Sequence, residues 1–173
     1  MTEPPQSPEK SRGAIILGWW STHLGKRETG RAKALAARLR RADPVAALAE
    51  GEVHDLSRAL NLRDGVALAR LACLLAEVRE HSNQSLAQRL GGTDPILSTL
   101  RFQKLLRAEE PELTALMRRA IAMADGVCNV AALGPDLLDW SEATRMRWCF
   151  HYYGAPAPQI LAPQANKTEE ISQ

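Results

Sequence analysis

Residues 31–42 read RAKALAARLRRA, and this stretch predicts the kind of fold that the chain adopts. At 100° per residue its apolar side chains fall on one narrow stripe, and its five cations spread over the opposite side. The stripe consists of Ala32, Leu35, Ala36 and Leu39. We therefore expect an amphipathic helix that packs through alanine and leucine and turns its cations outward.

The whole 173-residue sequence has the same bias toward helix formers. Leucine and alanine together supply 51 residues, whereas the β-branched residues valine, isoleucine and threonine supply only 20. This length and a hydrophobic content of 45% allow one domain, or two small lobes that share a core. The composition therefore predicts an all-α fold.

Prolines and capping residues mark where the predicted helices begin. Pro44, Pro95 and Pro111 each follow an acidic residue that can cap a helix, and Pro135 fits the same use. No proline is then expected inside a helix. About eight to ten helices are predicted, with boundaries uncertain by a few residues. They are residues 12–24, 29–41, 44–50, 53–61, 65–80, 84–91, 96–108, 111–125, 135–140 and 142–153.

The two ends of the sequence differ in composition from its middle. Residues 1–11 and 155–173 hold six of the ten prolines and are predicted to be disordered tails around a folded unit at 12–154. The apolar run at 14–20 is too short to cross a bilayer, so we expect no membrane partner and no secretion signal. The three cysteines form no Cys-x-x-Cys pair and are expected to be buried thiols in the cytoplasm.

Four predicted helices carry short basic sets with no acidic residue among the cations. These sets lie within residues 31–41, 101–107, 118–119 and 145–147. A solvated helix face usually mixes signs, because a carboxylate three or four residues away relieves the repulsion. The net charge is only +2, so the sets rather than the total suggest an anionic partner. Carboxylates from other helices are the alternative source of relief.

The sequence contains no recognisable catalytic or metal-binding pattern. Its four histidines are scattered, and its glycines form no phosphate-binding loop. We therefore expect no enzymatic activity, no metal, no cofactor and no small-molecule substrate. Residues 85–91, SLAQRLG, followed by a helix at 96 imitate a helix-turn-helix, which leaves a double-stranded DNA-binding regulator as an alternative.

The order and spacing of seven segments resemble the CasB family, the small subunit of the type I-E CRISPR surveillance complex Cascade. The segments are WW at 19–20, ARLRRA at 37–42, LRFQKLLRA at 100–108, LMRRA at 116–120, NVAAL at 129–133, LDW at 138–140 and RWCFHYY at 147–153. The resemblance extends over about residues 14–153. It implies a wholly helical, two-lobed protein without enzymatic activity, and we place the lobes at about 12–92 and 93–154.

The resemblance also implies the partners of the chain. In that family, two copies of the small subunit lie along the backbone subunits that carry the crRNA, and they contact the large PAM-reading subunit. Basic residues of the pair hold the displaced non-target DNA as a single strand. This contact stabilises the R-loop during antiviral defence.

Eleven basic residues are predicted to bind nucleic acid, because they match the basic sets of the family. They are Arg27, Arg40, Arg41, Arg63, Arg101, Lys104, Arg107, Arg118, Arg119, Arg145 and Arg147. Arg27 and Arg63 align more loosely than the others. A third hypothesis is a purely structural scaffold whose bases meet acidic protein surfaces.

Overall fold

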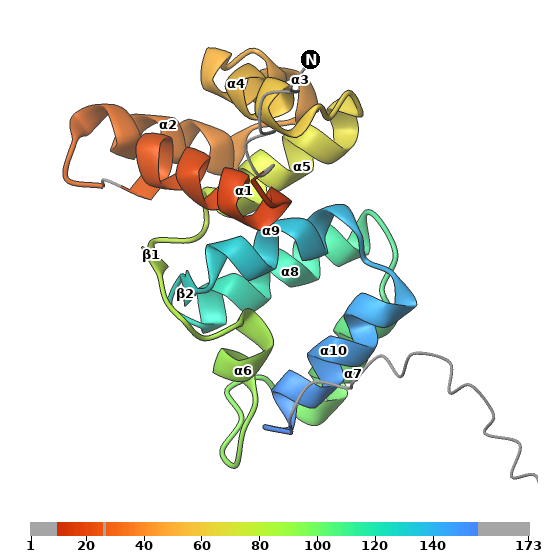
Figure 1. The fold of residues 1–173 in the computed structure, drawn as a ribbon. Coiled ribbons are helices and arrows are strands. Elements are labelled where there is room, and N and C mark those ends of the chain that lie inside the picture. Colours follow the sequence, from red (N-terminus) through yellow and green to blue (C-terminus); the bar gives the residue numbers. More distant parts are fainter. Residues whose placement is uncertain (1–9, 26, 156–173) are drawn as a thin grey trace, which may run out of the picture.

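A computed structural model describes residues 10–25 and 27–155 of the chain. The predicted disordered tails, residues 1–11 and 155–173, lie almost entirely outside these described residues. Helices make up nearly all of the regular structure that is described, and the predicted all-α fold is confirmed (Figure 1). None of the described helices has the length and apolarity needed to cross a membrane.

The N-terminal half is formed by α1 to α5. Its elements are α1 (Arg12–Trp20), a π-helical turn (Ser21–Gly25), α2 (Gly30–Arg41), α3 (Pro44–Leu48), α4 (Gly51–Leu60) and α5 (Gly65–Leu75). Side-chain caps start most of these helices: Thr29, Asp43 and Asp64 each accept a hydrogen bond from a backbone N–H of the first turn. The predicted use of Pro44 in the first turn of a helix is confirmed.

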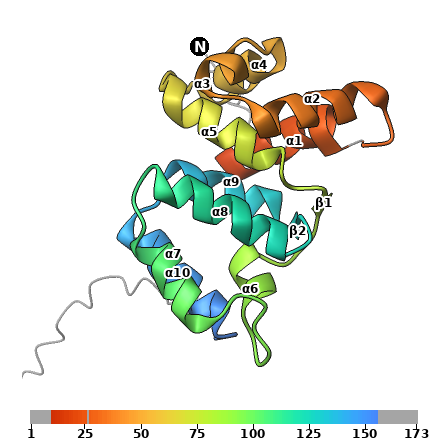
Figure 2. The same cartoon turned by 180° about the vertical axis from the view of Figure 1, so that it is seen from behind.

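The C-terminal half is formed by α6 to α10 and two very short strands. Its elements are β1 (Glu80–His81), α6 (Leu86–Leu90), α7 (Thr99–Arg107), α8 (Glu112–Met123), β2 (Val127–Cys128), α9 (Val130–Leu138) and α10 (Glu142–Tyr152). β1 pairs with β2 in parallel, a contact that the sequence did not predict. Figures 1 and 2 show α8 and α9 between α1 and α5 on one side and α7 and α10 on the other.

The two halves share one hydrophobic core, and the contact between α1 and α9 joins them most closely. Two glycines permit this approach. A Cβ atom at Gly13 would collide with the carbonyl oxygen of Ala131, and one at Gly134 would lie 2.6 Å from Cγ2 of Ile16. These helices therefore meet with little more than backbone between them.

Two prolines that were predicted to begin helices do not do so. The helix expected at 135–140 begins earlier, at Val130, where the Asn129 side chain caps it, and Pro135 lies inside it. Pro135 has no N–H to donate to Ala131, whose carbonyl instead faces Gly13. α7 begins at Thr99, within a few residues of the predicted start at 96, but Ser98 caps it and Pro95 lies before it.

We propose that the chain passes between the halves at β1, whereas the sequence predicts the lobe boundary at residue 92. α6 belongs with the C-terminal half, since Arg89 donates to the carbonyls of Val127 and Ala124 at 3.2 and 3.1 Å. The Gly92 N–H also donates to the Tyr152 carbonyl at 2.8 Å. We propose the division at residues 79–82 for this reason.

The cysteines are all free thiols. Cys73 and Cys128 are buried as predicted, and Cys149 is half-buried. Burial raises the pKa of the Cys128 thiol to about 12, so this side chain is neutral and unreactive.

Candidate nucleic-acid interface

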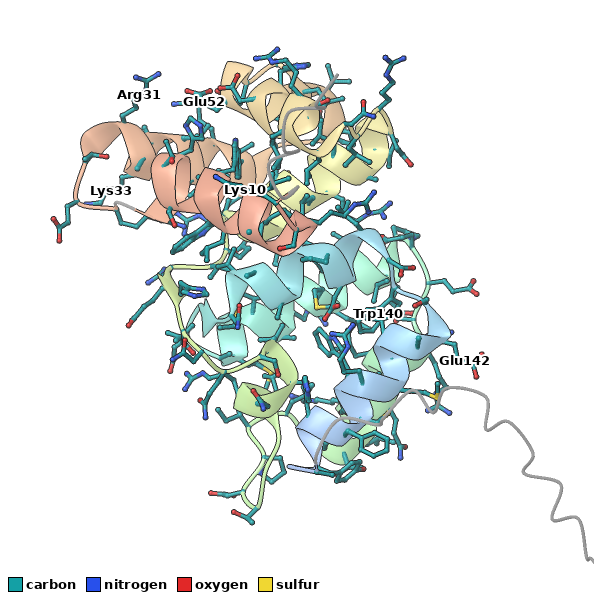
Figure 3. The ribbon with its side chains drawn as sticks, in the orientation of Figure 1. Lys10, Arg31, Lys33, Glu52, Trp140 and Glu142 are labelled. Carbon is teal, nitrogen blue, oxygen red and sulfur yellow. The ribbon has the colours of Figure 1, made fainter. Side chains whose placement is uncertain are left out.

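Carboxylates from outside each basic set relieve part of its charge. In α2, Arg31 points toward Glu52 (Figure 3) and lies 3.6 Å from one of its carboxylate oxygens. Arg38 donates to Glu50 at 2.6 and 3.1 Å. The hydrogen bond from Arg38 lowers the pKa of the Glu50 carboxyl. The outer part of α2 is therefore an ordinary solvated surface.

The last turn of α2 is different. Arg40 is half-buried and Arg41 is exposed, and neither donates a side-chain hydrogen bond or forms an ion pair within residues 10–25 and 27–155. Arg63, in the segment between α4 and α5, is likewise exposed and unpaired among those residues. These three cations are free for an external anion.

Arg27, in contrast, has a structural role. Its guanidinium donates to the carbonyls of Leu24, Ala76 and Val78 at 2.9, 2.6 and 3.0 Å. Burial lowers the pKa of Arg27, and the nearby positive charges of Arg40 and Arg79 lower it further. This residue fastens the turn after α1 to the end of α5, so the structure does not favour its predicted contact with nucleic acid.

Arg147 also bonds internally. Its two terminal nitrogens donate to the Asp136 carboxylate at 3.1 and 2.9 Å, and the Trp148 indole N–H donates to the same carboxylate at 2.8 Å. Asp136 is 5% exposed, so these donors balance a buried charge and join α9 to α10. Arg147 is therefore already paired with a buried carboxylate, although its side chain is 37% exposed.

Arg145 is intermediate between the unpaired cations and those whose donors are used internally. It is half-buried, and its side chain donates to the carbonyls of Ser141 and Leu106, both at 3.4 Å. The second bond satisfies a carbonyl in the last turn of α7, where a positive charge is also favourable. Arg145 therefore acts first as a cap for α7.

Three of the predicted cations come together in a groove between α7 and α8. Arg101 and Lys104 lie on the α7 side and Arg119 on the α8 side, around a hollow of about 290 Å³. The rest of the lining is apolar and consists of Leu97, Leu105, Leu116, Ala120 and Met123. We call this feature the α7–α8 groove.

The positive charge of the α7–α8 groove is largely unbalanced. Arg101 and Arg119 are exposed and have no carboxylate within ion-pair distance in the described part of the chain. Lys104 lies 3.2 Å from Glu112, in a pair whose side chains are 62% and 55% exposed, so water screens it strongly. Arg107, in the last turn of α7, is exposed and also unpaired there. A polyanion is the natural ligand for such a surface.

Arg118 lies on the other side of α8. Its Nε is 3.4 Å from a carboxylate oxygen of Glu77, beside a hollow of about 530 Å³ between α5 and α8. A second ion pair in this hollow joins Arg70 to Glu110 at 3.3 Å. We call this feature the α5–α8 groove. Both of its arginines have a carboxylate within ion-pair distance, although Arg118 Nε has no hydrogen-bond partner in the described part of the chain.

The predicted basic sets are divided between the two halves of the molecule. Arg101, Lys104 and Arg119 share a groove, whereas α2 and α7 lie in different halves of the molecule (Figures 1 and 2). Sequence reasoning missed the balancing acids Glu50, Glu77 and Glu112. No local signal identifies them, because each pairs with a cation on another helix or across a turn.

The helix-turn-helix alternative loses its geometric basis. Residues 91–98 separate α6 from α7, whereas the motif joins its helices by a turn of about three or four residues. Among the described residues, no cluster of three or more histidine, cysteine or acidic side chains is placed to hold a metal ion.

Comparison with known proteins gives consistent matches. A family model described as CRISPR-associated protein Cse2 matches residues 34–153. A protein of the same description from Thermus thermophilus is 37% identical over 62 residues, which are 34% of this chain and 37% of that protein. The chain thus aligns with little more than a third of that relative's length.

A solved structure is similar over a much larger part of the chain. The crystal structure of CasB from Thermus thermophilus matches with a TM-score of 0.65 and 25% sequence identity. The match covers 84% of this chain and all of the solved one. The helical architecture described above is therefore shared over nearly its whole length.

Proposed function

The chain belongs to the CRISPR-associated Cse2 family, and from this premise we propose that it is a non-catalytic small subunit of a type I-E Cascade complex that holds the displaced DNA strand. The observation that carries the proposal is the α7–α8 groove, with Arg101 and Arg119 unpaired on its two sides. Four further cations have no ion-pair partner among the described residues: Arg41, Arg63 and Arg107, which are exposed, and Arg40, which is half-buried.

The physical requirements of this role agree with the groove. R-loop formation exchanges one duplex for another of similar stability, so modest contacts to the displaced strand can tip the balance. Such contacts must accept any sequence, and arginines directed at phosphates meet this requirement. The proposed partners are a second copy of the chain, the backbone and PAM-reading subunits, and a crRNA-containing complex.

Substituting the two unpaired arginines tests the proposal. Arg101→Ala with Arg119→Ala removes two phosphate contacts, so the slope of log affinity against log salt for a single-stranded oligonucleotide should become shallower by about 1.4. Fluorescence anisotropy of a labelled oligonucleotide over a salt series measures this slope. The same double variant in the co-purified complex should leave the displaced strand more accessible to permanganate.

Arg31→Ala with Arg58→Ala is the matched control. Both arginines are exposed and paired with acids, and their loss changes the net charge equally. This variant should keep the wild-type slope. An unchanged slope in the groove variant contradicts the proposal, and failure of that variant to assemble favours the scaffold hypothesis.

A further inference from the structure

The α7–α8 groove contains apolar side chains that phosphate binding alone does not need. Cations alone hold a phosphate chain, yet five of the eight residues that line this groove are apolar. Leu97, Leu105 and Ala120 form a buried floor, at 6%, 2% and 2% exposure. Leu116 and Met123 are only half-buried and border the hollow from the α8 side.

The hollow is also much larger than the space that one water molecule needs. Its volume is about 290 Å³, whereas one water needs about 10–15 Å³ of such space. Water in the hollow contacts mainly apolar side chains. Replacing this water by an apolar group therefore lowers the free energy. The groove is therefore suited to a ligand with an apolar body and negative charge on both sides.

The cations on the two sides of the groove indicate where the negative charges of such a ligand would lie. On α7, Arg101, Lys104 and Leu105 fall on one stripe, since residues three and four apart share a helix face. On α8, Arg119 and Ala120 present the same combination of a cation beside an apolar residue. Positive charge thus stands on both rims, with the apolar floor between them.

We propose that the α7–α8 groove takes one unstacked base of a single strand between Leu116, Met123 and the floor, while the rim cations hold the phosphates on either side. The proposal rests on the proposed function, since it specifies how the displaced strand is held. Base faces are apolar and alike enough that such insertion tolerates any sequence. The thioether of Met123 is polarisable and adapts to bases of different shape.

The arrangement also selects single strands over duplexes. A base inside a duplex is stacked on both faces and must be extruded before it can enter, whereas a displaced strand is already unpaired. A surface of cations alone would not favour a single strand, because the phosphates of a duplex are the denser charge. An acidic peptide is the competing ligand, but its side chains offer no flat group to fill the hollow.

Binding of the full-length chain to two oligonucleotides tests the proposal. Oligo-dT and an equally long strand of abasic spacers carry the same phosphates, and affinity is measured by anisotropy at low salt. We expect oligo-dT to bind about fivefold tighter or more, with the same salt slope. Equal affinities overturn the insertion and leave the proposed function standing, whereas no binding of either strand overturns both.

A variant that fills the hollow locates the effect. Met123→Trp should abolish the preference for oligo-dT over the abasic strand and leave the salt slope unchanged. Met146→Trp, at an exposed methionine of α10 outside the groove, is the matched control and should keep the preference. A preference that survives Met123→Trp, with the fold verified by circular dichroism, places the bases elsewhere. Binding of polyglutamate as tight as that of oligo-dT also overturns the proposal.

Discussion

The grooves on the two sides of α8 differ in how their charges are balanced. In the α5–α8 groove, Arg70 and Arg118 each have a carboxylate partner from another element, Glu110 and Glu77. In the α7–α8 groove, Arg101 and Arg119 have none among the described residues. Arg118 and Arg119 are adjacent in the sequence, so the orientation of α8 alone separates a structural cation from one available to a ligand.

The interior of the C-terminal half contains a further cation that is balanced by a carboxylate. Arg147 and the Trp148 indole share the buried carboxylate of Asp136, so this pair belongs to the same balanced class as Arg118 and Glu77. We therefore expect changes to balanced cations to alter stability, and changes to unbalanced cations to alter nucleic-acid binding. Three experiments test this division, in order of decreasing effect.

Asp136→Ala should have the largest effect. It leaves the buried Trp148 N–H and the Arg147 guanidinium without their acceptor, which should lower the free energy of unfolding by about 3 kcal/mol. Urea denaturation measures the loss. The salt slope for single-stranded DNA should not change in the folded variant. Asp94→Ala, at an exposed aspartate, is the control, and an equally small loss in both variants would contradict the structural role of Asp136.

Arg118→Ala and Arg119→Ala form a matched pair on opposite sides of α8. The first leaves the mostly buried Glu77 without its partner and should cost about 1 kcal/mol of stability. The second should cost less than about 0.5 kcal/mol but reduce the salt slope by about 0.7. Urea denaturation and anisotropy on both variants measure the two effects. Equal changes in slope would show that the two grooves are not distinct.

Glu112→Gln should have the smallest effect, in the opposite direction. It frees Lys104 from its exposed partner, so affinity for single-stranded DNA should rise by about twofold, as expected for a surface pair worth about 0.5 kcal/mol. Glu142→Gln removes the same charge from the exposed first turn of α10 and controls for net charge. An increase of equal size in both variants would mean that Lys104 is not restrained by Glu112.

Much of the fold could be predicted from the sequence because its signals are local. The stripe of Ala32, Leu35, Ala36 and Leu39 is the buried face of α2, as the helical period required. The start of α9 was mistaken because Pro135 was taken as a start signal, whereas the Asn129 side chain caps the helix and Pro135 lies inside it. The parallel pairing of β1 with β2 could not be predicted, since each strand has two residues.

The candidate site could be predicted only in part, because the signals in the sequence are local and the partners of the cations are distant along the chain. Periodicity identified the cations of α2, α7 and α8, but it assigned the same role to Arg118 and Arg119. The sequence also grouped Arg27 and Arg147 with them, although their donors are used by Ala76, Val78 and Asp136. Whether a cation is free depends on acceptors that lie tens of residues away along the chain.

The sequence by itself determined that this chain is helical, which face of each helix packs, and which segments carry unrelieved positive charge. These properties follow from spacing within one helix, where residues three and four apart are neighbours. Only the tertiary structure decided which cations meet a carboxylate and which border the α7–α8 groove. Electrostatic balance acts through space between helices, so the packing of α8 against α5 and α7, and not the order of residues, separates Arg118 from Arg119.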